Sequence, residues 1–175
     1  MRETDDLYGK LQRAYPAGVP NLFRTLMGNP AVARGFIALD DQLEADGVLT
    51  PAERLTVGLI TALHMDCAYC RAALSKEAAE AGAPADVIAA ILRDTVPDDA
   101  RPRALLTATR RLVETKGRLP RAECAHFARM GLGEAALLEI IAVIGVFTIA
   151  THANNLMRTR IDPEYRGGDA AAAQA

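Results

Sequence analysis

The feature that limits the architecture of this chain most strongly is a Cys-x-x-Cys pair, Cys67 and Cys70, set between two helical segments. The apolar run from Leu55 to Leu63 precedes the pair, and the helix-like run from Arg71 to Ala81 follows it. A spacing of one helical turn lets the two sulfurs form a disulfide where the local geometry permits. A helix start also supplies free backbone N–H groups and a positive dipole, which favour thiolate over thiol. Redox chemistry at this pair is therefore the leading functional hypothesis.

The rest of the sequence predicts an all-α fold. It contains no sustained alternation of apolar and polar residues, aromatic residues make up only 5%, and good helix formers dominate. Half of the residues are apolar and 24% are charged, which suits one domain with a real core. We expect that domain to span residues 1–166, with the low-complexity tail, residues 167–175, disordered. The net charge of −2 argues against a nucleic-acid partner.

Helix start and stop signals divide the chain into a series of helices. Thr50 to Glu53 form a capping box with proline at the first helical position, which is the strongest of these signals. Asp66 is expected to cap the helix that carries the cysteines. The predicted helices run from Asp5 or Asp6 to about Tyr15, from Pro20 to Gly28, from Pro30 to Asp46, from Thr50 into the Leu55–Leu63 run, from Asp66 to Gly82, from Pro84 to Leu92, from Asp99 to Lys116, from Pro120 to Gly131 and from Gly133 to Met157.

The last predicted helix is apolar over more of its surface than one small bundle usually covers. Part of it is therefore expected at a subunit interface of a homo-oligomer. Its longest apolar run, Ala135 to Ala150, is interrupted by Glu139 and Thr148 and is shorter than the roughly 20 residues of a membrane span. The charged N-terminus is followed by no apolar signal core. We therefore expect a cytoplasmic protein without a membrane partner, in which a cysteine pair is more often catalytic or metal-binding than structural.

The order of these elements resembles the AhpD-like alkylhydroperoxidases of the carboxymuconolactone decarboxylase superfamily. The resemblance rests on the capped apolar helix, the Cys67-Ala-Tyr-Cys70 segment and the alanine-rich helix that ends at Gly82. Residues 20–26 (Pro-Asn-Leu-Phe-Arg-Thr-Leu) and the late segment from Thr148 to Pro163, with its Asn154, are also similar to that family. The resemblance covers roughly residues 20 to 163. It implies an all-α subunit that assembles as a trimer or hexamer.

The resemblance also implies the chemistry. In this family a cysteine pair reduces organic hydroperoxides, so Cys70 would be the attacking residue and Cys67 the resolving residue. An external thiol or dithiol would then reduce the disulfide, and no bound cofactor is implied. Family members usually carry a glutamate about a dozen residues before the first cysteine and a histidine four after the second, where this chain has Leu55 and Leu74. Neither leucine carries a proton, and positioned proton transfer is typically worth about 10²–10⁴-fold in rate.

Two histidines are candidates for the missing proton relay. His64 lies one helical turn before Cys67, although it is also placed to interact with a helix C-terminus. His152 lies on the last predicted helix close to Asn154 and Asn155, where it would line the active pocket or make a buried interhelical hydrogen bond. Glu53 is the nearest upstream carboxylate, but the capping box already accounts for it.

The other chemistry-bearing residues have plainer interpretations. Both cysteines of the pair could simply be buried small hydrophobes. No second Cys/His pair lies at zinc-site spacing, so no metal is expected. The negative charge of Asp66 would oppose formation of a thiolate at Cys67. Tyr69 is expected to pack beside the pair, and Cys124 and His126 are assigned no role. Lys76, Glu77 and Glu80 are expected to form a solvated face.

Three functional hypotheses follow. The first is a thiol peroxidase that uses Cys70 and Cys67. The second is a lyase similar to the carboxymuconolactone decarboxylases, which act without a cysteine pair. The third is a catalytically degenerate scaffold or redox sensor that kept its thiols.

Overall fold

Proline and glycine residues set most of the helix boundaries, as the sequence predicts. The computed structural model describes residues 2–166, and within them it contains nine α-helices, one short 3-10 helix and no strand. The predicted all-α fold is therefore confirmed, whereas the predicted disordered tail lies outside the described residues. The elements are α1 (Arg2–Ala14), α2 (Asn21–Leu26), α3 (Pro30–Asp46), α4 (Pro51–His64), α5 (Ala68–Glu80), α6 (Ala85–Leu92), α7 (Ala100–Thr115), α8 (Arg121–Arg129), α9 (Glu134–Met157) and η1 (Pro163–Tyr165).

The capping box at the start of α4 forms as predicted. The Thr50 hydroxyl accepts a hydrogen bond from the Glu53 backbone N–H, and the Glu53 carboxylate accepts one from the Thr50 N–H. These two bonds satisfy two N–H groups that the first turn of a helix leaves without partners. The start of this central helix is thus determined locally by the sequence.

Two boundaries differ from the prediction. Helix α1 begins at Arg2 rather than at Asp5 or Asp6. Helix α5 is capped by Cys67 and not by Asp66, which adopts a left-handed backbone conformation (φ 47°) one residue earlier. The Asp66 side chain is 89% exposed and pairs with Arg71 at 3.2 Å. The negative charge of Asp66 is therefore paired with the mostly buried Arg71.

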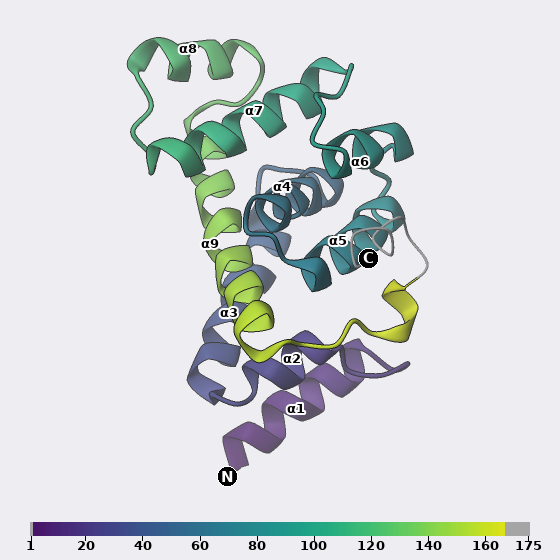
Figure 1. The fold of residues 1–175 in the computed structure, drawn as a ribbon. Coiled ribbons are helices and arrows are strands. Elements are labelled where there is room, and N and C mark those ends of the chain that lie inside the picture. The colour runs from purple at the N-terminus through teal and green to yellow at the C-terminus, as the bar shows by residue number, and fades with distance from the viewer. Residues whose placement is uncertain (1, 167–175) are drawn as a thin grey trace.

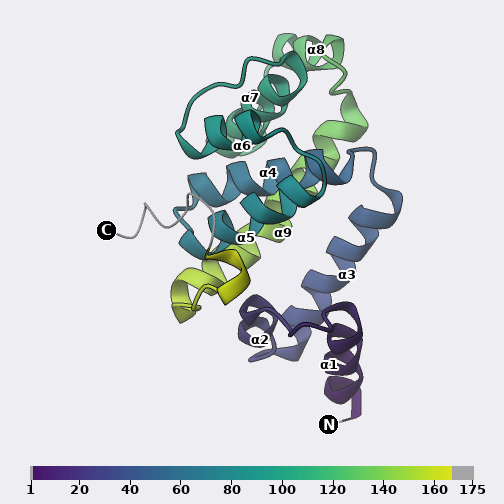
Figure 2. The ribbon, with the colours of Figure 1, turned by 90° about the vertical axis from the view of Figure 1, so that its right-hand side faces the viewer.

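Helix α4 is the centre of the molecule. It packs against α5, α9 and α7, and α9 also contacts α2 and α3. In Figure 1, α9 extends along one side from the end that holds α7 and α8 to the end that holds α1 and α2. The view in Figure 2 shows the same two ends separated by the layer of α4 and α5. The cysteine pair, at the start of α5, therefore lies on the side of the core that faces α2.

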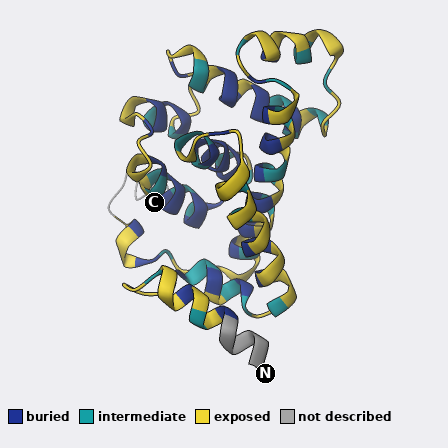
Figure 3. Ribbon diagram, turned by 180° about the vertical axis from the view of Figure 1, so that it is seen from behind, coloured by how far each residue is buried: buried dark blue, intermediate teal, exposed yellow. Residues whose placement is uncertain are grey.

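Helix α9 combines a buried face with an exposed apolar stripe. By length and apolar composition it would suit a membrane span, but 44% of its most apolar window is buried inside the fold. Its Glu139 carboxylate is buried and accepts hydrogen bonds from the Val48 and Leu49 backbone N–H groups, the latter at 3.2 Å. A Cβ on Gly47 would come within 2.4 Å of that carboxylate, so only glycine fits there. In Figure 3 the buried residues concentrate where α4, α5 and α9 meet, whereas α8 is mostly exposed.

The chain after α9 returns to α2. The Thr159 and Thr25 hydroxyls lie 2.8 Å apart, and the Asn21 side-chain amide donates to the Arg160 carbonyl at 2.9 Å. These contacts join two segments that are far apart in the sequence. They place η1 beside α5, with which it is in contact.

Candidate active site at the start of helix α5

The first cysteine of the pair is the N-cap of α5. The Cys67 backbone is extended (φ −104°), and its sulfur accepts a hydrogen bond from the Cys70 backbone N–H at 3.5 Å. Both cysteines are buried, with exposed fractions of 0% and 3%, and both are free thiols. A sulfur in the N-cap position faces the positive end of the helix dipole, which favours the thiolate.

The two thiols have opposite pKa shifts because they share a hydrogen bond. The Cys70 thiol donates to the Cys67 sulfur, and this bond is the main reason why the pKa of Cys67 falls to about 7. Burial opposes the shift, while the backbone N–H groups of Cys70 and Tyr69 and the charge of Arg71 support it. The same hydrogen bond, together with burial, raises the pKa of Cys70. The two shifts favour the thiolate at Cys67 and the proton at Cys70.

Asn154, on α9, contacts the second cysteine. Its side-chain N–H donates to the Cys70 sulfur at 3.3 Å, and the residue is 2% exposed. This donor lowers the pKa of Cys70, against the larger effects that raise it. The side-chain oxygen of Asn154, Oδ1, is buried and has no hydrogen-bond partner in the described part of the chain. The side-chain N–H group of Asn154 is thus the atom that links α9 to Cys70.

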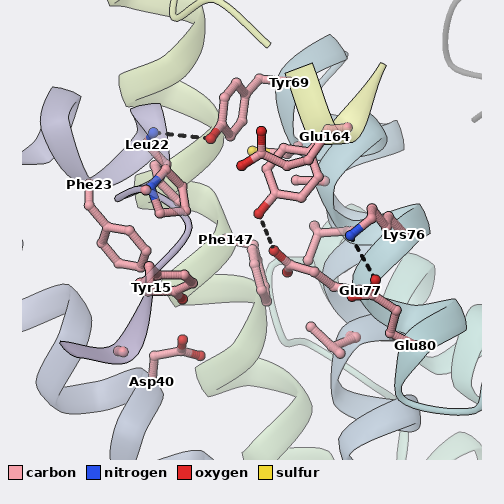
Figure 4. Close-up of a pocket in the computed structure, with 18 of the residues that line it drawn as sticks. Tyr15, Leu22, Phe23, Asp40, Tyr69, Lys76, Glu77, Glu80, Phe147 and Glu164 are labelled. Atoms are coloured by element: carbon pink, nitrogen blue, oxygen red, sulfur yellow. Dashed lines mark hydrogen bonds and ion pairs between the residues drawn. The ribbon is translucent and has the colours of Figure 1, made fainter. Parts of the chain in front are cut away.

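A cavity of about 610 Å³ reaches Cys70. Helices α3, α4, α5 and α9 and the segments around α2 and η1 contribute its walls, and Cys70 lies in the lining, whereas Cys67 does not. Figure 4 shows the side chains that surround this space. Its wall contains six aromatic rings, those of Tyr15, Phe23, Phe36, Tyr69, Phe147 and Tyr165. A small organic molecule in the cavity would therefore meet the sulfur of Cys70 and not that of Cys67.

Tyr69, between the two cysteines, is fixed by a polar brace. Its hydroxyl donates to the Asp162 carboxylate at 2.6 Å and accepts from the Leu22 backbone N–H at 3.1 Å. Asp162 also accepts from the Asn21 N–H at 3.0 Å. Burial and the Asp162 carboxylate raise the pKa of Tyr69, so it remains a neutral donor. The tyrosine packs in the core as predicted, and its hydroxyl also ties α5 to α2 and to the segment before η1.

Charged groups line the opposite part of the cavity. Arg54 is buried and donates to Asp40 at 2.7 Å, while Glu77 accepts a hydrogen bond from the Tyr165 hydroxyl at 2.9 Å. Burial raises the pKa of Glu77. Glu77 is half-buried in the cavity wall, so the predicted solvated face is wrong for this residue, although Lys76 and Glu80 are exposed. Cys70 and Glu77 are two helical turns apart on α5, and this spacing could have predicted that they lie on the same face of the helix.

The structure does not bring the predicted relay histidines to the cavity. His64 lies in a different hollow with Asp94, Arg110 and Glu114. His152 is exposed, and its Nδ1 lies 2.8 Å from the Thr148 carbonyl of its own helix. The expectation that His152 lines the pocket or bonds across helices is therefore wrong, because the side chain turns back along α9.

Glu53 does not line the cavity either. Arg101 and Thr50 bind its carboxylate, and together these hydrogen bonds outweigh burial and lower its pKa. Leu55 and Leu74, at the positions that the resemblance assigns to the proton relay, do line the cavity. Cys124 lies in a separate groove at the other end of the molecule. Within residues 2–166, no group of three His, Cys, Asp or Glu side chains is arranged to hold a metal ion.

Comparisons with known proteins agree with this architecture. Residues 30–114 match the carboxymuconolactone decarboxylase family. An uncharacterised peroxidase-related protein from Ralstonia eutropha JMP134, described as an alkylhydroperoxidase AhpD core, shares the fold with a TM-score of 0.82 at 23% identity over 92% of this chain and 87% of that one. A peroxidase-related protein from Silicibacter sp. TM1040 superposes with a TM-score of 0.81 at 19% identity over 95% and 88%.

A third solved structure is that of a debrominase. The debrominase Bmp8, in complex with 2,3,4-tribromopyrrole, superposes with a TM-score of 0.75 at 19% identity over 94% of this chain and 90% of that one. At these identities the likeness concerns the fold. The curated proteins contain no match to the sequence.

Proposed function

We propose that the chain is a thiol peroxidase of the AhpD-like and carboxymuconolactone decarboxylase superfamily, a proposal that the family match over residues 30–114 and the shared fold support. In this proposal Cys70 reduces an organic hydroperoxide and Cys67 resolves the oxidised sulfur. The observation that carries it is the arrangement of the pair: Cys70 lines a cavity and lies next to the Cys67 sulfur, which caps the same helix and whose pKa is lowered to about 7. A nucleophile that faces a cavity and contacts its own base is the arrangement that nucleophilic catalysis requires.

The pair supplies the proton transfer that Leu55 and Leu74 do not. Near neutral pH the Cys67 thiolate accepts the proton of Cys70 through the hydrogen bond that already joins them. A base with a pKa close to the working pH is the most effective. As charge moves onto Cys70, the Asn154 N–H group at 3.3 Å stabilises the new thiolate. Cys67 is therefore both the base for the first step and the nucleophile for the second.

The proposed reaction has three steps: oxidation of Cys70, formation of the disulfide and its reduction. The Cys70 sulfur attacks the terminal oxygen of the hydroperoxide, the O–O bond breaks, and the leaving alkoxide takes the proton that Cys67 had accepted, which gives the alcohol, a Cys70 sulfenic acid and a Cys67 thiolate. The Cys67 thiolate then attacks the Cys70 sulfur, hydroxide leaves and is protonated to water, and a disulfide forms. An external thiol or dithiol returns two electrons and two protons. One hydroperoxide is thus converted to one alcohol and one water.

A homo-oligomer is the proposed assembly, with the exposed stripe of α9 as its interface. Leu138, Ile141, Ile149 and Leu156 follow one another at helical spacing and are at least 40% exposed. Replacing Leu138 and Ile141 together by glutamate is expected to reduce the sedimentation coefficient to that of a monomer. Val96→Glu, which alters an exposed apolar residue off this stripe, should leave it unchanged. A monomeric wild type would contradict the proposal.

A reducing compartment such as the cytoplasm is proposed as the location, because it keeps the three cysteines reduced.

Mass spectrometry of the reduced protein treated with cumene hydroperoxide tests the proposed function. We expect one alcohol per hydroperoxide and a loss of two hydrogens that maps to Cys67 and Cys70. Cys124→Ser should behave like the wild type. Thiols that stay intact in excess hydroperoxide would support the inert scaffold, and decarboxylation of a lactone that survives Cys70→Ser would support the lyase.

A further inference from the structure

The charged side chains in the wall of the Cys70 cavity are unevenly balanced. Five carboxylates line it, and they face only two cationic side chains. Both cations are already paired: Arg54 donates to Asp40 at 2.7 Å and lies 3.9 Å from Glu44, and Lys76 lies 2.7 Å from Glu80. Five carboxylates and two cations leave the wall with excess negative charge, and in the described part of the chain Glu77 and Glu164 pair with neither cation.

Glu77 is the carboxylate of this group that lies inside the wall. It is half-buried, and within residues 2–166 its hydrogen bond comes from the neutral Tyr165 hydroxyl and not from a cation. Figure 4 shows it extending from α5 toward the ring of Phe147, with Tyr15 and Asp40 on the other side of the space. A cleft with low-dielectric walls and one sign of charge focuses its field on an entering molecule.

The six aromatic rings define the other half of the environment. Aromatic faces bind apolar groups and attract cations. One such contact already exists at the cavity, where the Lys76 ammonium lies 5.9 Å from the centre of the Tyr165 ring. The wall is therefore suited to apolar and to positively charged groups, and poorly suited to anions.

From these observations, and resting on the proposed reaction at Cys70, we propose that this cavity selects its substrate by charge. It takes uncharged or cationic organic hydroperoxides with an apolar or aromatic body, and it excludes hydroperoxides that carry a carboxylate. The reactive site is the cavity at Cys70, and the carboxylates decide which molecules reach the sulfur. The same field disfavours a carboxylated lactone, the substrate of the lyase alternative.

Alkylation of Cys70 by iodoacetamide and by iodoacetate tests this selection without peroxidase activity. The two reagents have nearly the same shape and differ in charge. In a Cys67→Ser, Cys124→Ser protein, Cys70 is the remaining thiol. We expect the ratio of the iodoacetamide rate to the iodoacetate rate to be about tenfold higher in the folded protein than in the same chain unfolded in urea. Added NaCl should reduce this difference.

Single substitutions show which carboxylates change the ratio of the two alkylation rates. Glu77→Gln, which keeps an oxygen to accept the Tyr165 hydroxyl, should lower the folded ratio by roughly two- to fivefold. Glu164→Gln, at an exposed position of the rim, should lower it by a smaller factor. Glu134→Gln removes one exposed carboxylate outside the cavity and should leave the ratio unchanged. Equal ratios in the folded and unfolded chain, or a folded ratio that neither Glu77→Gln nor Glu164→Gln lowers, would overturn the proposal.

A second measurement separates this proposal from the proposed function. The wild type is given a fatty-acid hydroperoxide and the methyl ester of the same molecule, and faster consumption of the ester is the expected result. Equal consumption would overturn the charge selection and leave the peroxidase standing. A charge bias in alkylation without consumption of either hydroperoxide would refute the peroxidase and support the selection.

Discussion

In the described part of the chain, Cys70 and Cys124 lie in two different hollows, and the surroundings of these hollows differ. Hydrogen bonds and an ion pair join α2, α3, α4, α5, α9 and η1 around the cavity at Cys70. The groove at Cys124 lies between α7, α8 and α9 and is lined by apolar residues, with Glu134 as its single charged group. Cys67 and Cys70 have shifted pKa values because a helix start and a shared proton act on them. Cys67 and Cys70 thus differ from Cys124 in the groups that surround them, since Cys70 and Cys124 both line a hollow.

The largest effect should come from exchanging the nucleophile. Cys70→Ser is expected to lower the rate of hydroperoxide reduction by about a thousandfold or more, because a hydroxyl does not replace a thiolate. Cys124→Ser should leave the rate within about twofold. Steady-state consumption of cumene hydroperoxide with an excess dithiol measures both. A loss of activity in Cys124→Ser but not in Cys70→Ser would contradict the assignment of the reaction to the cavity at Cys70.

The brace on Tyr69 should contribute substantially to stability. Asp162→Ala leaves the buried Tyr69 hydroxyl without its acceptor and frees the Asn21 N–H, so it is expected to cost about 2–4 kcal/mol in the free energy of unfolding. Tyr69→Phe should cost less, and the double variant should cost less than the sum of the two. Urea unfolding measures each value. Tyr8→Phe, at an exposed tyrosine, is the control, and strict additivity would show that the brace is not a coupled pair.

Two glycines inside helices differ in the space around them: Gly58 is closely packed, whereas Gly35 faces open space. A Cβ on Gly58 of α4 would lie 2.6 Å from the Phe147 ring, which lines the cavity, whereas a Cβ on Gly35 of α3 would meet nothing within 4 Å. Gly58→Ala should therefore destabilise the protein by about 1–3 kcal/mol. Gly35→Ala should stabilise it by up to about 1 kcal/mol through helix propensity. Thermal unfolding compares the two, and equal shifts would contradict the close packing of Phe147.

Neighbouring asparagines on α9 give the next smaller effect. Asn154→Leu removes the donor to Cys70 and should slow the oxidation of the pair by roughly tenfold, the worth of one hydrogen bond to a charged group. Asn155→Leu removes an exposed contact to the Met65 carbonyl and should leave that rate unchanged. Stopped-flow measurement of thiol oxidation reports both. If the two variants behave alike, Asn154 has only a structural role.

Local sequence signals predicted the helices well, and they predicted the site only in part. Proline, glycine and the Thr50 capping box act within one turn, so the starts of α3 and α4 follow from a few neighbouring residues. The cysteine pair was recognisable for the same reason. Asp66 was a poor choice of cap, because the left-handed conformation of its backbone could not be inferred from its side chain.

The rest of the site depends on contacts between distant segments. Asn154 reaches Cys70 from 84 positions along the chain, and Asp162 reaches Tyr69 from 93. No spacing rule connects such pairs, which is why His64 and His152 were plausible candidates. Glu77 is the exception, because its two-turn spacing from Cys70 placed it on the same face of α5.

The proton shared by Cys67 and Cys70 is tested most directly by the pH dependence of the oxidation of the reduced protein by cumene hydroperoxide. A lowered pKa means that the Cys67 thiolate is lost as the pH falls through about 7. The rate should therefore rise through about pH 7 and level off above it. In Cys67→Ser the rise should move upward by one unit or more, since no thiolate base remains. A rise only near the ordinary cysteine pKa of about 8.5 in both proteins would contradict the shared proton on which the proposed mechanism depends.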